Sequence, residues 1–292
     1  MQESLSLWIK GARPRTLPAA IAPVAVGTAC VSVEANATAN WSNAILALIV
    51  SLALQVAVNY ANDYSDGVRG TDDKRVGPLR LVGSGAKTAS AVKRAAFLSF
   101  GVAAIFGLIL ALLTSLWLLV VGVLCILAGW FYTGGKKPYG YFGLGEVFVF
   151  VFFGVVATTG TTFVIIEKLT VTSFTASLVV GALACALLAV NNLRDIDGDT
   201  LARKRTLAVR LGDKKARSFF VSLFVLALLA IFVLALSYPL ALLGLVGLGS
   251  AFTSIKRVRS GAVGSELISV LSMTGRTQIL TAITLSIGLI LS

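Results

Sequence analysis

Long apolar runs, separated by short polar stretches, are the main pattern along this chain. Many reach about 18 residues or more, which is enough for an α-helix to cross the hydrocarbon core of a bilayer. The pattern predicts an all-α, polytopic membrane protein that forms one integral-membrane domain over residues 1–292. Nine transmembrane helices are predicted, over residues 16–33, 44–62, 95–113, 116–133, 146–166, 173–192, 218–237, 240–255 and 277–291.

The composition agrees with this class. Hydrophobic residues make up 57% of the chain and charged residues 13%, about half the charged share of an average soluble domain. The chain has no His, which excludes a His-ligated metal and a His general base. Its three Cys lie in apolar runs without metal-like spacing and are interpreted as small apolar fillers.

The net charge of +12 could suggest a nucleic-acid partner, but the position of the charge argues against one. All but one of the 25 Lys and Arg residues fall at the N-terminus or in alternate loops on the same predicted side, the exception being Lys168. Such a bias marks the cytoplasmic side of a membrane protein. We therefore expect a multi-pass protein of the cell membrane, with its N-terminus in the cytoplasm.

Two acidic clusters follow two of the apolar runs, and both face the cytoplasm in this topology. Residues 62–73 and 191–199 together hold seven of the thirteen Asp and Glu residues. Asn62 and Asp66, like Asp195 and Asp199, are spaced i, i+4 and would share a face of a helix. Mg²⁺ binds one or two carboxylates and completes its shell with water and phosphate oxygens. With basic residues beside them, the clusters predict a site for a lipid diphosphate.

A simpler interpretation is that some of these acids are solvated loop residues that balance a basic face. It is kept open above all for Asp72, Asp73, Asp197 and Asp213.

A third feature is the stretch from Tyr132 to Glu146. Tyr132 and Lys136 are candidates for the site, although an interfacial Tyr and a cytoplasmic Lys would explain them equally well. The Gly-rich turn that follows carries Tyr139 and Tyr141, which could stack on a ring. Glu146 is an ionisable group near membrane depth and so a functional candidate.

Three motifs, Asn62-Asp63-x-x-Asp66, Tyr132-x-x-x-Lys136 and Asp195-x-x-x-Asp199, together resemble those of the UbiA superfamily of intramembrane prenyltransferases. The resemblance extends nearly end to end. Stretches such as 12–18, 62–72, 132–146 and 191–195 are similar to the branch that prenylates 1,4-dihydroxy-2-naphthoate in menaquinone biosynthesis. Gly70 stands where the wider pattern has a further Asp, and Asp72 is the candidate replacement.

The resemblance implies a nine-helix bundle with a central cavity open to the cytoplasm and laterally to lipid. It implies Mg²⁺-dependent transfer of a polyprenyl group from polyprenyl diphosphate to 1,4-dihydroxy-2-naphthoate, with loss of CO₂ and diphosphate. The implied metal ligands are Asn62, Asp63, Asp66, Asp72, Asp195 and Asp199, and Tyr132 and Lys136 join the four motif Asp residues as catalytic candidates. The implied substrate-binding residues are Asn62, Arg75, Arg80, Tyr139, Glu146, Asn192, Lys204 and Arg205.

Three alternatives stay open at this point. Another UbiA-type branch, for example one using 4-hydroxybenzoate, would share the metal motifs. A CDP-alcohol phosphatidyltransferase is also Asp-rich and intramembrane, but its Asp-Gly-x-x-Ala-Arg signature is one residue shorter than the stretch 197–203. A cation-coupled transporter would carry its acids within the apolar segments, whereas here they lie at the segment ends.

Overall fold

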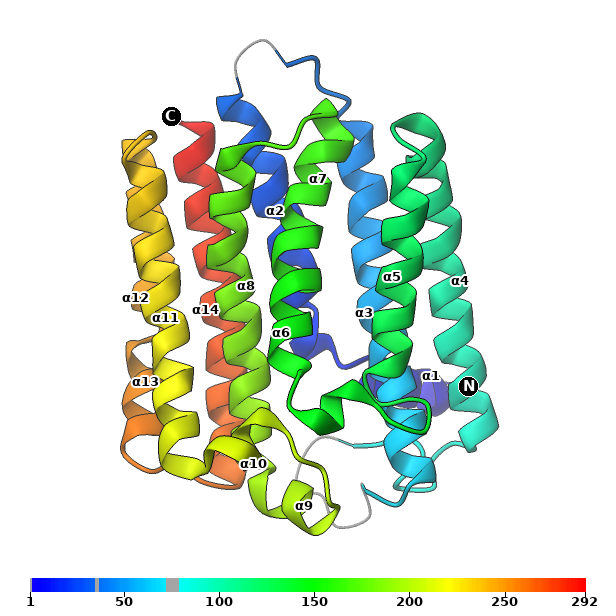
Figure 1. The fold of residues 1–292 in the computed structure, drawn as a ribbon. Helices are drawn as coiled ribbons and strands as arrows, with labels where there is room; N and C mark the ends of the chain where they lie inside the picture. The colour runs from blue at the N-terminus through cyan, green and yellow to red at the C-terminus, as the bar shows by residue number, and fades with distance from the viewer. Residues whose placement is uncertain (1, 35–36, 72–78) are drawn as a thin grey trace.

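A computed structural model describes residues 2–34, 37–71 and 79–292, and every regular element in this part of the chain is helical. Long helices run side by side, and shorter elements gather at one end (Figure 1). The first half contains α1 (Gln2–Ala12), η1 (Pro14–Thr16), α2 (Pro18–Cys30), η2 (Val31–Val33), α3 (Ser42–Val68), α4 (Ala89–Leu113), α5 (Trp117–Phe131), η3 (Tyr139–Phe142), α6 (Gly145–Val149), η4 (Phe150–Val156) and α7 (Ala157–Ile166). The second half contains α8 (Val171–Arg194), α9 (Ile196–Leu201), α10 (Leu207–Leu211), α11 (Asp213–Ala235), η5 (Pro239–Leu243), α12 (Gly244–Gly249), α13 (Phe252–Arg259) and α14 (Ser265–Ile290).

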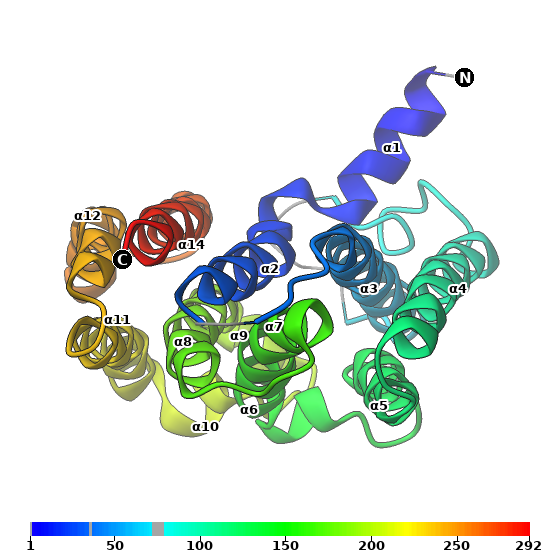
Figure 2. The same ribbon diagram turned by 90° about the horizontal axis from the view of Figure 1, so that it is seen from above.

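Seen end-on, the helices form two outer groups with a central one between them (Figure 2). Helices α11 to α14 make one outer group and α3 to α5 the other, while α2, α6, α7 and α8 lie in the middle. Helix α1 projects outward across the end of the bundle. The described acids of the first cluster, Asp63 and Asp66, lie on α3 in one outer group, whereas those of the second lie at the end of α8, in the central group, and on α9.

Among the described residues, five helices are long and apolar enough to cross a membrane, or up to seven if each of two bent pairs is one span. The bent pairs cover residues 5–33 and 239–259, with bends of 53° and 48°. Helix α5 is shorter, at 15 residues. The prediction of an all-helical membrane protein is confirmed, whereas the count of nine spans stays a prediction.

Helix α3 extends past its predicted end at residue 62 and ends at Val68. Its 27 residues correspond to roughly 40 Å, compared with about 30 Å for the hydrocarbon core. Asn62, Asp63 and Asp66 of the first acidic cluster therefore lie on helical backbone, in turns that extend beyond the apolar part. The hydropathy pattern did not predict this extension, because Asn, Asp and Ser lower the mean hydropathy of the segment without ending the helix.

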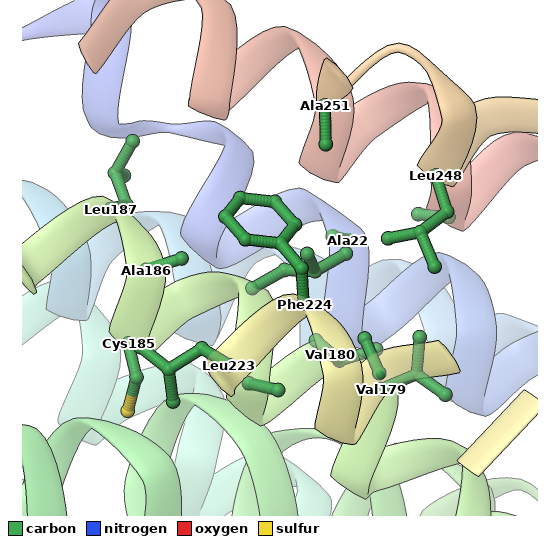
Figure 3. Close-up of a cluster of buried hydrophobic side chains, with 14 of the residues drawn as sticks. Ala22, Val179, Val180, Cys185, Ala186, Leu187, Leu223, Phe224, Leu248 and Ala251 are labelled. Carbon is green, nitrogen blue, oxygen red and sulfur yellow. The ribbon is translucent and has the colours of Figure 1, made fainter. Parts of the chain in front are cut away.

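Helix α8 contributes many residues to the main cluster of buried hydrophobic side chains. Within its most apolar 18-residue stretch, 83% of the residues are buried. Ten of its 24 residues are Ala, Gly, Ser or Thr, and such small residues allow close helix packing within a membrane. Phe224 of α11 belongs to the same cluster of buried side chains as Val180 and Leu187 of α8 and Leu248 of α12 (Figure 3). Cys30 and Cys185 are buried free thiols, as expected for small apolar fillers.

The middle of the α6–α7 rod is a π-helix, η4, and it packs against α8. A Cβ atom added at Gly154 would lie 2.5 Å from the Cα atom of Gly181, so the two backbones are in direct contact. This contact fixes the rod against α8 and leaves its other face toward α3 and α5. That face forms one wall of the cavity described next.

Candidate active site

A cavity of about 710 Å³ extends between the central helices and the α3–α5 group. At one end it is lined by Asp66, Asp199 and Lys204. At the other end it reaches Leu110 and Val164, which lie near the C-terminal ends of α4 and α7. It therefore extends along most of the length of the bundle, with charged residues at one end and mostly apolar residues along the rest.

Asp66 is the buried acid at the polar end, with 2% of its surface exposed. Its Oδ1 atom accepts a hydrogen bond of 2.9 Å from the Tyr141 hydroxyl. Its Oδ2 atom lies 3.6 Å from Nζ of Lys204 and 3.9 Å from Nη2 of Arg80. The carboxylate is thus held from both sides, with Oδ2 toward two cations that also line the cavity.

Lys204 joins the two acidic clusters. Its Nζ atom lies 3.6 Å from Oδ2 of Asp66 and 3.8 Å from Oδ1 of Asp199. Thr206 is 3.4 Å from the other Asp199 oxygen and begins α10 as its N-cap. Asp66 of the first cluster and Asp199 of the second therefore both lie within 4 Å of one ammonium group.

Asn62 lies one helical turn before Asp66 and lines the same cavity. Its Oδ1 atom accepts a 2.8 Å hydrogen bond from the hydroxyl of Thr133, just after α5. The i, i+4 spacing thus puts both residues on one face of α3. Asn62 is also tied to the segment that links α5 to α6.

Asp63 has a different environment from Asp66, although both belong to the same motif. It is fully buried and does not line the cavity. Its Oδ2 and Oδ1 atoms accept hydrogen bonds from the backbone N–H groups of Leu81 and Val82, at 2.8 and 3.0 Å. These contacts anchor the segment before α4 and place Arg80 beside Asp66. Its predicted role as a metal ligand stays a prediction.

Asp195 also lines the cavity, between α8 and α9. The Nε and Nη2 atoms of Arg194 donate to its two oxygens at 2.7 and 2.8 Å. Nη2 of Arg194 also donates to the side chain of Asn191 at 2.7 Å. The i, i+4 pair Asp195 and Asp199 therefore spans a helix break, where the backbone N–H of Asp199 still bonds to the Asp195 carbonyl at 2.8 Å.

Aromatic side chains form a wall beside the polar end. Tyr132, Tyr139, Phe148 and Phe152 all line the cavity. Tyr139 stacks on Phe148 with ring centroids 3.9 Å apart, and Tyr132 meets Tyr139 edge-on at 5.6 Å. Burial raises the pKa of Tyr139. The wall continues to Phe152, whose ring is 5.9 Å from that of Phe148.

Glu146 is buried behind this wall rather than in it, and it reaches the cavity through Asn192. The amide Nδ2 of Asn192 donates to Oε1 of Glu146 at 2.9 Å. The second carboxylate oxygen, Oε2, is buried and has no hydrogen-bond partner among the described residues. The two predicted residues thus form one polar unit at the junction of α6 and α8.

The other predicted residues lie elsewhere. Lys136 and Arg205 are exposed and are not among the residues that line the cavity. Asp72 and Arg75 lie outside the described residues. Their assigned roles therefore stay predictions.

Tyr141, the second candidate for ring stacking, does not line the cavity. Its ring instead carries Nζ of Lys204 at 4.9 Å and Cζ of Arg69 at 5.2 Å. Burial and the neighbouring Asp66 carboxylate raise the pKa of Tyr141, so its hydroxyl is protonated at neutral pH and donates to Asp66. Sequence reasoning missed this contact because it depends on how the η3 turn packs against α3.

Arg194 was also missed as a site residue, since the sequence shows it as one of many cytoplasmic basic residues. The side chain is 2% exposed, lines the cavity and has one buried nitrogen, Nη1, without a hydrogen-bond partner among the described residues. Its place next to Asp195 is the one signal in the sequence that could have identified it.

The donor set at the polar end fits a hard divalent cation. Asp66 and Asp199 approach the same cationic atom within 4 Å, and Mg²⁺ typically takes one or two carboxylates with water and phosphate oxygens. Within the described ranges, no three Asp, Glu or Cys side chains form a ready-made metal cluster. A metal held here would therefore share its shell with a phosphate-bearing ligand.

Comparisons with known proteins agree with this geometry. The UbiA prenyltransferase family matches residues 20–266. The 1,4-dihydroxy-2-naphthoate octaprenyltransferase of Mycobacterium tuberculosis is 49% identical over 280 residues, covering 96% of this chain and 95% of that protein. The Escherichia coli protein of the same name is 35% identical, covering 98% and 95%.

Solved structures share the fold. A UbiA homolog from Archaeoglobus fulgidus bound to GPP and Mg²⁺ superposes with a TM-score of 0.70 at 13% identity, covering 98% of this chain and 99% of that one. The apo structure of a UbiA homolog from Aeropyrum pernix K1 gives a TM-score of 0.69 at 16% identity, covering 94% and 97%.

Proposed function

Because this chain belongs to the UbiA prenyltransferase family, we propose that it transfers a polyprenyl group from polyprenyl diphosphate to 1,4-dihydroxy-2-naphthoate. The chain is a prenyltransferase of the menaquinone pathway. The reaction releases diphosphate and CO₂ and gives demethylmenaquinol. The observation that carries the proposal is the 49% identity to a 1,4-dihydroxy-2-naphthoate octaprenyltransferase over nearly the whole of both chains.

The polar end of the cavity would receive the diphosphate. Asp66, Asp199, Asp195 and Asn62 would hold Mg²⁺, which supplies a positive charge that stabilises the departing diphosphate oxygens. Lys204 and Arg80 lie beside Asp66 and would bind the same oxygens through charge-assisted hydrogen bonds. Arg194, with a buried nitrogen still unpartnered among the described residues, supplies a further donor. These contacts favour cleavage of the allylic C–O bond, whose electron pair leaves with the diphosphate.

The apolar part of the cavity would hold the prenyl tail. It is lined by Leu110, Leu118 and Val164 at its far end, and a site without bulk water protects a carbocation from hydrolysis. Tyr139 and Phe148 line the cavity between its polar end and its apolar part. The faces of their rings attract cations through the ring quadrupole. The allylic cation would thus form against this aromatic wall.

The acceptor would lie between the aromatic wall and Asn192. The Asn192–Glu146 pair would orient the naphthoate hydroxyl groups, and the ring carbon bearing the carboxylate would attack the cation. The bond to the carboxylate then breaks, and its electrons restore the aromatic ring as CO₂ leaves. Because CO₂ and not a proton leaves that carbon, this step needs no general base, which suits a chain without His.

The basic residues support an orientation with the polar end in the cytoplasm. The loops at that end carry nearly all Lys and Arg residues, which favours the cytoplasmic side. We place the protein in the cell membrane, where both the polyprenyl donor and the quinol product are lipid-soluble.

A labelled acceptor tests the proposed reaction. Purified protein would be supplied with Mg²⁺, a polyprenyl diphosphate and 1,4-dihydroxy-2-naphthoate labelled in the carboxylate. We expect one labelled CO₂ for each prenylated product. Label retained in the product, or transfer to 4-hydroxybenzoate alone, would assign the chain to another UbiA-type branch and leave the fold and metal assignments intact.

A further inference from the structure

Tyr141 connects three segments that converge at the polar end of the cavity. Its hydroxyl donates to Asp66 of α3 at 2.9 Å. Its ring carries Lys204, from the α9–α10 link, and Arg69, which follows α3. Its own carbonyl accepts a 3.0 Å hydrogen bond from the backbone N–H of Arg205. The η3 turn therefore contacts Asp66 of the first acidic cluster and the α9–α10 link that follows the second, although Tyr141 does not line the cavity.

We propose that Tyr141 is a positioning residue that sets the metal-facing orientation of Asp66 through its hydroxyl and the place of Lys204 through its ring. The inference rests on the proposed function and adds to it a residue outside the three sequence motifs. The two parts of the side chain have separate roles, and separate substitutions can remove them.

The hydroxyl acts on the metal site. It donates a hydrogen bond to Oδ1 of Asp66, so that Oδ2 faces Lys204, Arg80 and the cavity. Without this donor, Oδ1 is a buried carboxylate oxygen that has lost its partner, which is unfavourable. The carboxylate then turns both oxygens toward the neighbouring cations, and Mg²⁺ has to displace a stronger ion pair.

The ring acts on the diphosphate site. An ammonium group about 5 Å from an aromatic face is held there by the ring quadrupole, and Lys204 lies at 4.9 Å. Arg69 lies on the same ring and also bonds to the backbone carbonyls of Thr133 and Gly135. Loss of the ring frees Lys204 from one of its fixed contacts, so diphosphate binding weakens as well.

The test compares Tyr141→Phe, Tyr141→Leu and a control on the same turn, Phe142→Leu, whose side chain is 47% exposed. For Tyr141→Phe we expect the Mg²⁺ concentration at half-maximal activity to rise about tenfold, as for a lost hydrogen bond to a charged group. The kcat at saturating Mg²⁺ and the KM for prenyl diphosphate should stay within about twofold of wild type. Tyr141→Leu should raise both the Mg²⁺ requirement and that KM, while Phe142→Leu changes neither.

A second readout is thermal unfolding of the purified protein during titration with Mg²⁺ in the presence of inorganic pyrophosphate. Tyr141→Phe should need about tenfold more Mg²⁺ for the same stabilisation. No stabilisation of the wild-type protein would overturn the proposed diphosphate site itself. Wild-type stabilisation with an unchanged Tyr141→Phe titration would overturn the role of Tyr141, as would a fall in its kcat without a shift in Mg²⁺ requirement.

Discussion

The Nζ atom of Lys204 lies 3.6 Å from Oδ2 of Asp66, although the two residues come from opposite halves of the chain. The same nitrogen lies 3.8 Å from Asp199. One positive charge therefore lies between two carboxylates from different acidic clusters. Carboxylates this close repel each other unless a cation separates them, so Lys204 lets the two halves of the site meet.

Replacing Lys204 by Met should change metal and diphosphate binding in opposite directions. Without the ammonium group, Asp66 and Asp199 attract Mg²⁺ more strongly, and thermal stabilisation by Mg²⁺ alone should need a lower concentration. The KM for prenyl diphosphate should rise about tenfold or more, because a charge-assisted contact is lost. Lys215→Met, at an exposed position on α11, is the matched control and should leave both values unchanged. If the Mg²⁺ concentration needed for stabilisation rose together with the KM, Lys204 would not be competing with Mg²⁺ for the two carboxylates.

Asp63 and Asp66 should respond differently to the same substitution. Asp66→Asn removes charge at the cavity and should abolish Mg²⁺-dependent turnover while the midpoint of thermal unfolding in detergent stays near that of wild type. Asp63→Asn should lower that midpoint, since an amide N–H₂ would face one of the backbone N–H groups of Leu81 and Val82. A buried donor left unpaired costs about 1–3 kcal/mol.

Both parts of that comparison can fail independently. An active Asp66→Asn variant would show that the Asp66 carboxylate is not needed to hold Mg²⁺. An Asp63→Asn variant of normal stability that has lost its response to Mg²⁺ would instead return Asp63 to the metal site.

The sequence predicted the helical class and singled out the Asp and Asn residues that line the polar end, because both depend on local patterns. Apolar runs mark the helices, and i, i+4 spacing puts Asn62 and Asp66 on one face of α3. The division of labour between Asp63 and Asp66 could not be predicted in this way. It depends on the segment with Leu81 and Val82 folding back onto α3, which is a contact between distant parts of the chain.

The partners of the aromatic residues were also beyond the sequence. Tyr139 and Tyr141 are two residues apart in one turn and look equivalent as candidates for ring stacking. The turn directs Tyr139 to the cavity wall against Phe148 and Tyr141 to Asp66. Gly140 makes this possible, because a Cβ atom there would lie 2.6 Å from the carbonyl oxygen of Tyr132.

The orientation in the membrane can be measured with single cysteines in a background where the three native Cys are replaced. Cysteines at the exposed positions Thr38 and Lys168 should react with an impermeant thiol reagent in sealed cells. Cysteines at Lys137 and Lys214, exposed at the other end of the bundle, should react only after the membrane is opened. The reverse pattern would place the polar end of the cavity outside the cytoplasm.

The last prediction concerns the length of prenyl chain that the cavity accepts. Gly122 of α5 lines the apolar part of the cavity, and a Cβ atom added there would meet no atom within 4 Å. The first atom of a side chain therefore has room at this position, and we expect a phenyl ring built on it to extend into the cavity. It would stand between the aromatic wall and the far end near Leu118 and Val164, where the distal isoprene units of a long donor would lie.

Gly122→Phe should accordingly distinguish donors by length. We expect kcat/KM for octaprenyl diphosphate to fall about tenfold or more, as expected when a pocket loses the room for part of its substrate, with geranyl diphosphate affected less than about twofold. The matched control is Gly101→Phe, because Gly101 lies on α4, also has open space at its Cβ position and does not line the cavity. The geranyl reaction reports that the polar end is intact, so a loss confined to the long donor locates the tail. An equal loss with both donors would mean that the introduced ring distorts the site, and no loss with either would place the tail along another path, since a chain passing Gly122 could not avoid the ring.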